Sequence, residues 1–63
     1  MKNLIAQRLS EKEISIRELS KRTGKPYAHI HEIVRAETIG GRSLDVLVEI
    51  SKAIGCEVTD LFE

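Results

Sequence analysis

The chain has little of several residue types that stabilise or mark other classes of protein. Its 63 residues include one cysteine, one proline, one tyrosine, one phenylalanine and no tryptophan. A single cysteine excludes an internal disulfide, and no apolar run approaches the roughly 20 residues of a transmembrane helix. The N-terminal segment MKNLIAQRLS has polar residues where a signal peptide needs an apolar stretch. We therefore expect a soluble, cytoplasmic protein without a membrane partner.

The length predicts one domain, residues 1–63. A chain this short buries only about 60% of its unfolded surface, so its stability is marginal unless it oligomerises. We therefore expect a partner subunit.

An excess of charge of one sign is also missing, because ten cations balance ten anions. The two signs are unevenly distributed along the chain. Residues 1–42 carry nine cations against five anions, and residues 43–63 carry one cation against five anions. Such a dipolar molecule can present its cationic part to phosphates, although a solvated mixed-charge surface is the alternative interpretation.

The stretch SIRELSKRTGKPYAHIHEIVR predicts two short helices joined by a turn. Ser15 and Glu18 have capping-box spacing, so a helix should begin at about Ile16. It should end near Thr23, because Gly24 can adopt the left-handed conformation that closes a helix. The pattern is that of a helix-turn-helix.

The second helix of this pair should start at Pro26 or Tyr27 and run to Arg35. Ile30, Ile33 and Val34 have the i, i+3, i+4 spacing of one buried face. The side chains predicted to point away from the core are those of Ala28, His31, Glu32 and Arg35.

The rest of the chain also favours helices and no strand. We expect a first helix from Asn3 or Leu4 to about Lys12, and a loop at 36–42 whose Ile39 packs onto the core. Ser43 and Gly55 bracket a strongly apolar helix, Leu44 to Ile54, which should be central. Thr59 is a possible cap for a final turn. The fold class predicted is all-α, a compact bundle of about five short helices.

These residues resemble the lambda-repressor-like, Cro/XRE-type helix-turn-helix DNA-binding family. The similarity runs through IRELSKRTG, PYAHIHEIVR and SLDVLVEISKAIGCEVTDLF, which together span most of the chain. The resemblance implies a five-helix bundle, a third helix in the major groove of DNA, dimeric binding to operator half-sites and regulation of transcription.

The sequence departs from the family pattern at three sites that bear on mechanism. Lys25 and Pro26 stand where the turn usually carries an apolar residue and then a Ser or Thr cap, and Lys25 can instead approach a phosphate as a point charge. Ile16 stands where relatives open the second helix with a glutamine that contacts the DNA backbone. Leu9 and Val34 stand where many relatives have a buried arginine–glutamate pair. Replacing both members of such a pair with apolar groups is often neutral or stabilising, so we predict that Leu9 and Val34 meet in the core.

Individual residues can also be given roles. The predicted base contacts are Tyr27, Ala28 and Glu32, which match the base-reading positions of the family, and His31, for which a phosphate contact is the alternative. The chemistry is admissible, because a methyl group can meet thymine's methyl and a carboxylate can accept from cytosine N4. The predicted DNA-backbone contacts are Arg17, Lys21, Lys25, Arg35 and Arg42. The predicted dimer interface comprises Val46, Val48, Ile50, Val58 and Phe62.

No residue pattern indicates catalysis, a cofactor or a ligand-sensing region. His29 and His31 are two apart on a helix and cannot chelate one metal as an i, i+4 pair could, so we predict no metal site. Cys56 is interpreted as a small buried hydrophobe, with a redox sensor as the less favoured alternative. No nucleophile and base have the spacing of an enzyme active site, so an enzyme is not expected.

Two functions are compatible with these residues. The first is a small dimeric transcriptional regulator, acting as a repressor, that binds a palindromic double-stranded DNA operator through its third helix. The alternative is a protein-interaction module or antitoxin-like adaptor that uses the same helical face. The salt dependence of duplex binding distinguishes them, because neutralising phosphates releases counterions.

Overall fold

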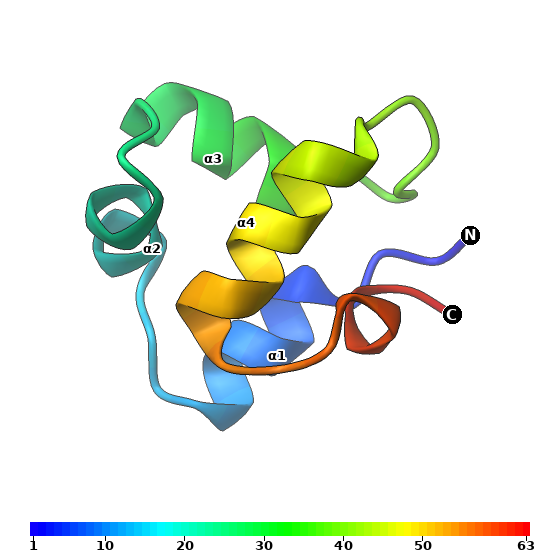
Figure 1. Cartoon of the computed structure of the whole chain (residues 1–63), viewed down its shortest axis with the longest axis horizontal. Helices are drawn as coiled ribbons and strands as arrows, with labels where there is room; N and C mark the ends of the chain where they lie inside the picture. Colours follow the sequence, from blue (N-terminus) through cyan, green and yellow to red (C-terminus); the bar gives the residue numbers. More distant parts are fainter.

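The computed structural model describes all 63 residues and is helical, as predicted. Figure 1 shows α4 crossing the middle of the molecule, with α2 and α3 on one side and α1 on another. The elements in chain order are α1 (Ile5–Glu11), α2 (Ile16–Thr23), α3 (Tyr27–Arg35), α4 (Leu44–Ile54) and a 3-10 turn, η1 (Val58–Leu61). The first helix is therefore shorter at both ends than its predicted range. None of the helices has the length and apolar character that crossing a bilayer requires.

The helix-turn-helix has the boundaries that its local sequence predicts. Ser15 Oγ accepts a hydrogen bond from the Glu18 N–H at 3.0 Å, which starts α2. Gly24 closes the helix at φ 73°, a conformation that costs glycine little. Only half of the predicted capping box forms, because the Glu18 carboxylate pairs instead with Arg22 at 3.1 Å.

The end of the chain is capped differently from the prediction. The Asp60 carboxylate accepts a hydrogen bond from the Glu57 N–H at 3.0 Å, so the final turn starts at Glu57. Thr59 lies inside η1, and the prediction that it caps the turn was wrong. An acidic residue three positions after the cap performs this function because its carboxylate reaches back to a free backbone N–H.

The core gathers apolar side chains from every helix, η1 and the α3–α4 connector, residues 36–43. Leu47, Ile50 and Ile54 supply the contribution of α4, which confirms that this helix is central. Ile39 of the connector is also buried, as predicted. Leu9 and Val34 are buried in the same cluster and line one groove between α1 and α3.

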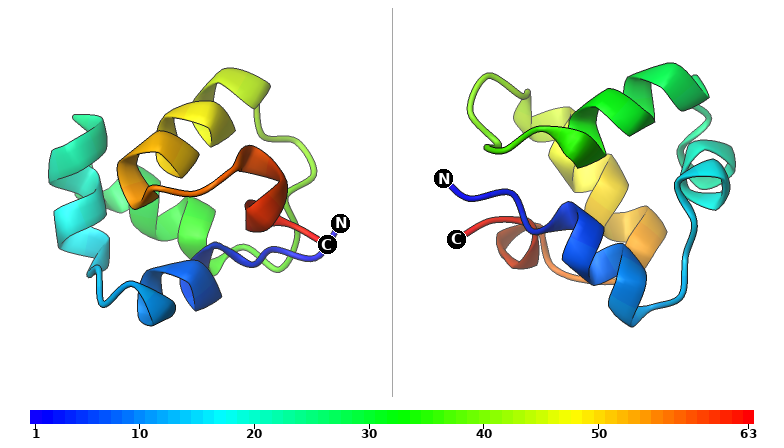
Figure 2. Two further views of the ribbon diagram at one scale, coloured as in Figure 1. Left: turned by 60° about the horizontal axis from the view of Figure 1, so that its bottom comes forward. Right: turned by 180° about the vertical axis from the view of Figure 1, so that it is seen from behind.

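The N-terminal segment ties the two ends of the chain to the connector. Lys2 N–H donates to Glu63 O at 2.8 Å, and Ile39 N–H donates to Met1 O at 3.1 Å. Figure 2 shows the two termini side by side next to the connector in both views. The only β-type pairings are two isolated bridges, Lys2 with Thr38 and Asn3 with Phe62.

Asn3 joins the end of α3 to the start of α1 through its side chain. Its amide nitrogen donates to Ile33 O at 2.9 Å and to Ala36 O at 2.8 Å. Its Oδ1 accepts from the Ile5 N–H at 2.9 Å. Backbone groups at both helix ends that lack intrahelical partners are thereby satisfied, and the last turn of α3 is held in place.

Candidate nucleic-acid interface

The outer face of α3 is exposed along the whole helix. Ile30, Ile33 and Val34 are buried, as their spacing predicts. The outer face consists of five exposed side chains, which include all four predicted base contacts: Tyr27, Ala28, His31, Glu32 and Arg35. Because the opposite side of the helix is locked into the core, this face keeps a fixed orientation.

An aromatic and cationic stack lies at the start of this face. The Arg17 guanidinium of α2 lies 5.5 Å from the Tyr27 ring centroid. The Tyr27 and His31 rings are 5.9 Å apart between centroids and tilted by 34°. Cation–π contacts at exposed sites are worth about 0.5–1 kcal/mol, enough to favour this arrangement without fixing it. The sequence did not reveal the stack because it depends on how α2 crosses α3.

Lys25 is less available than the sequence suggested. Its Nζ lies 3.0 Å from Glu49 Oε2 of α4, and its side chain is 22% exposed. It stands between α2 and α3 but turns toward the acidic second half of the chain. Lys25 is therefore not a free cation in this structure, and a phosphate could contact it only in competition with Glu49.

Arg42 approaches the outer face of α3 from the connector. Its Nη1 lies 3.9 Å from Glu32 Oε1, so a predicted backbone contact and a predicted base contact form one ion pair. Its Nε is buried and has no hydrogen-bond partner.

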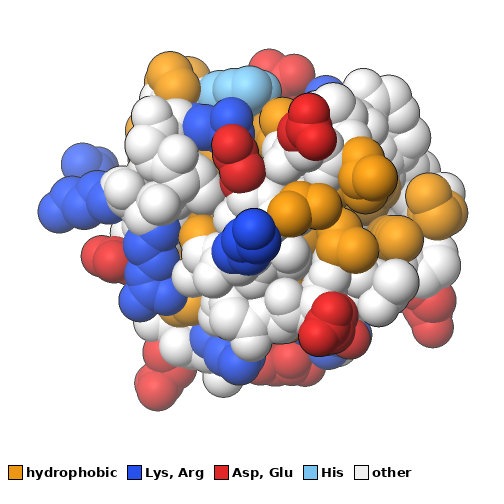
Figure 3. All heavy atoms as spheres, viewed as in Figure 1, with side chains coloured by type: hydrophobic (Ala, Val, Ile, Leu, Met, Phe, Trp, Pro, Cys, Tyr) orange, Lys and Arg blue, Asp and Glu red, His pale blue; other side chains and the backbone are white.

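Three predicted DNA-backbone contacts are exposed and belong to no ion pair within 4 Å: Arg17, Lys21 and Arg35. Figure 3 shows Lys and Arg side chains projecting on the side of the molecule where α2 lies. The predicted DNA-backbone contacts that make no ion pair thus come from α2 and from the last turn of α3.

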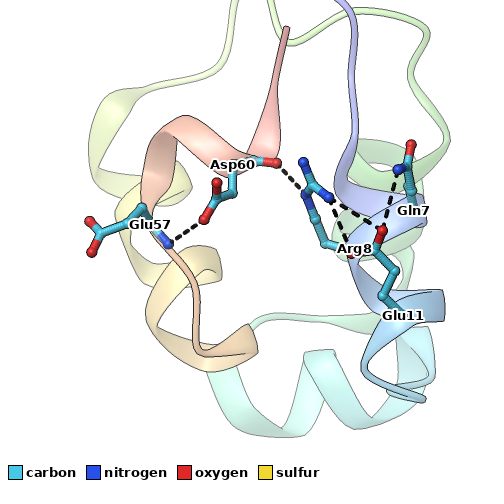
Figure 4. A network of polar contacts seen from close by, with 5 residues as sticks. All are labelled: Gln7, Arg8, Glu11, Glu57 and Asp60. Carbon is cyan, nitrogen blue, oxygen red and sulfur yellow. Dashed lines mark hydrogen bonds and ion pairs between the residues drawn. The ribbon is translucent and has the colours of Figure 1, made fainter.

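A polar network on another side of the molecule joins α1 to η1 (Figure 4). Arg8 Nε donates to Asp60 O at 2.7 Å, and its Nη1 donates to Glu11 Oε1 at 3.1 Å. This hydrogen bond from Arg8 is the main cause that lowers the pKa of the Glu11 carboxyl. These hydrogen bonds of Arg8 are all made within the protein, and the one to Asp60 O holds α1 against η1.

Cys56 lies beside this network and is half-buried, so it is less enclosed than predicted. Burial, followed by the charge of Asp60, raises the pKa of its thiol. A raised pKa leaves the thiol protonated and poorly nucleophilic at neutral pH. No three His, Cys, Asp or Glu side chains are grouped closely enough to hold a metal ion, and His29 is an exposed residue of α3.

The predicted dimer-interface residues separate into two groups. Val46, Val48, Val58 and Phe62 are half-buried, so each retains some accessible surface. Ile50 is 0% exposed within the subunit, so its assignment to an interface was wrong; its side chain fills the core. Leu44 was not predicted to lie at the interface, yet it is 66% exposed one helical turn before Val48. Figure 3 shows hydrophobic side chains gathered over the first half of α4 and toward the chain ends.

Comparison with known proteins identifies the family. The family model described as "Cro/C1-type HTH DNA-binding domain" matches residues 5–63. No curated protein and no solved structure matches the chain. The match covers the helix-turn-helix, the connector, α4 and η1, which confirms the resemblance seen in the sequence.

Proposed function

The chain belongs to the Cro/C1-type helix-turn-helix DNA-binding family, and from this we propose that it is a dimeric transcriptional repressor of a palindromic operator. In this proposal α3 of each subunit enters the major groove of one half-site. The two-fold symmetry of the dimer would match the symmetry of the operator.

The observation that carries the proposal is the exposed outer face of α3, presented by a helix whose other side is locked into the core. A helix of this width fits the major groove, and its first turn and middle can reach base edges. Ala28 can meet a thymine methyl group, and Glu32 can accept from cytosine N4. Tyr27 and His31, which lie against each other and beside Arg17, would face the same groove.

The free cations support contacts with phosphates on both sides of this helix. Arg17, Lys21 and Arg35 need give up no ion pair to reach a phosphate, whereas Lys25 must leave Glu49 and Arg42 must leave Glu32. Phosphate contacts set the register of the protein on the duplex and carry no sequence information themselves. We therefore assign the positioning role chiefly to Arg17, Lys21 and Arg35.

The exposed apolar side chains of α4 support the dimer. Leu44 and Val48 lie four residues apart on one face of the helix, which places them together at the surface. Val46, Val58 and Phe62 add partly exposed apolar area. Burying this surface against a second subunit would compensate for the small core of a 63-residue chain.

Selection of bound duplexes from a random library tests the proposal directly. The operator recovered should be palindromic, and its titration should depend steeply on salt. The three unpaired cations of each subunit, Arg17, Lys21 and Arg35, give a log–log slope of about −5 for a dimer, at about −0.9 per phosphate.

The pairing of Lys25 and Arg42 with acidic residues favours a second candidate, a protein-interaction module. Such a module would give a slope near zero with every duplex and no enriched sequence in the selection. That outcome would replace the DNA-binding proposal.

A further inference from the structure

The Arg42 guanidinium has fewer hydrogen-bond partners than it can use. Its Nε is the only buried side-chain nitrogen or oxygen in the molecule that lacks a hydrogen-bond partner. Its contact with Glu32, at 3.9 Å, is too long for a good hydrogen bond. A guanidinium offers five N–H donors and forms its strongest contacts with two oxygens at once. The free protein therefore leaves Arg42 with unused donors at the edge of the outer face of α3.

The connector that carries Arg42 is fixed at several points. Ile39 is 3% exposed, and its backbone N–H donates to Met1 O at 3.1 Å. Arg42 N–H donates to Ile39 O at 3.2 Å, across a tight turn that contains Gly41 at φ 85°. The backbone thus places Arg42 beside α3, and turning its side chain away from Glu32 would break no hydrogen bond of the buried Nε.

Glu32 is the only anion on the outer face of α3, and its side chain is 70% exposed. A carboxylate that faces DNA is repelled by phosphates unless a cation neutralises it or a base amino group donates to it. In the free protein the neighbouring cation is Arg42. A phosphate offers the guanidinium two oxygens, which is a better partner than the single long contact with Glu32.

We propose that Glu32 and Arg42 act as an exchangeable pair that couples base readout to a phosphate contact. The inference rests on the proposed DNA-binding function and goes beyond it in making the two contacts conditional on each other. On a duplex without the matching base, Arg42 stays with Glu32 and neutralises it. On the operator, Glu32 accepts a hydrogen bond from a base amino group, and Arg42 turns to a phosphate near the connector.

This exchange predicts that Arg42 counts as a phosphate contact on the operator only. Arg42→Ala should lower the magnitude of the salt slope on the operator by about 0.9 per subunit and leave the slope on a scrambled duplex unchanged. Lys21→Ala is the matched control, because Lys21 is exposed and belongs to no ion pair. As a phosphate contact independent of Glu32, it should lower the slope on both duplexes equally.

A second variant tests the same idea without altering Arg42. Glu32→Gln removes the charge that holds Arg42, at an exposed site where folding should be unaffected. Arg42 is then free on every duplex, so the slope on scrambled DNA should become steeper by about 0.9 per subunit. Adding Arg42→Ala to Glu32→Gln should cancel that increase.

Several outcomes would overturn the exchange. An equal loss of slope on both duplexes for Arg42→Ala would make Arg42 an ordinary phosphate contact. No loss on either duplex would remove it from the interface. An unchanged scrambled slope for Glu32→Gln would show that Glu32 does not restrain Arg42. These results require wild-type protein that binds the operator; if the wild type shows no salt-dependent binding to any duplex, the proposed function itself has failed.

Discussion

Replacing Asn3 with alanine should destabilise the protein out of proportion to the size of the side chain. The substitution removes two hydrogen bonds to carbonyls at the end of α3 and one from the first N–H of α1. At about 1 kcal/mol for each net hydrogen bond, the expected loss is about 2–4 kcal/mol. In a domain of this size, about 1 kcal/mol corresponds to roughly 4–8 °C in Tm, so Tm should fall by about 8–32 °C.

The assay is thermal and urea unfolding, followed by circular dichroism. Lys2→Ala is the matched control, because the Lys2 side chain is exposed and only its backbone makes hydrogen bonds in this region. Asn3→Asp separates the two ends of the contact: it keeps an acceptor for the Ile5 N–H but loses the donors to Ile33 O and Ala36 O. If Asn3→Ala changed Tm by no more than Lys2→Ala, the side chain would not be joining the helices and this reasoning would fail.

Three further predictions concern the core, the surface and the charges. Val34→Glu should lower the unfolding free energy by several kcal/mol, because it buries an unpaired carboxylate, and adding Leu9→Arg should restore part of the loss in urea titrations. Leu44→Lys should shift sedimentation at micromolar concentration toward the monomer with little change in Tm, whereas a wild-type protein that is itself monomeric with and without DNA would contradict the dimer. The lowered pKa of the Glu11 carboxyl contributes stability that is present at neutral pH and is lost as pH falls through the folded-state pKa. The difference in unfolding free energy between wild type and Arg8→Gln should therefore shrink in acid.

The helix boundaries were predictable because their causes are local. Ser15 and Ser43 accept hydrogen bonds from N–H groups three residues later, and Gly24 and Gly55 adopt positive φ at the opposite ends. These interactions need only a few neighbouring residues, so spacing along the sequence is enough to find them. The buried face of α3 was predictable for the same reason, because helical periodicity fixes which side chains share a face.

The wrong predictions concern side chains whose surroundings depend on tertiary packing. The sequence could assign Ile50 to a surface because α4 is apolar on more than one side, and only packing shows which side the core occupies. Thr59 was predicted to cap the final turn because a hydroxyl is a frequent cap, yet the turn starts at Glu57, whose N–H donates to the Asp60 carboxylate. Lys25 looked free because its partner, Glu49, lies 24 positions away in the chain.

The sequence by itself determined the family, the all-helical class, the helix-turn-helix and the exposed residues of α3. Only the tertiary structure decided which charges are available, because an ion pair such as Arg42 with Glu32 depends on how the connector turns back against α3. Likewise, the Asn3 side chain reaches α3 only once the N-terminal segment lies against the connector and the chain end. Local hydrogen bonds and periodicity are written in residue spacing, whereas contacts between distant residues depend on the path of the folded backbone.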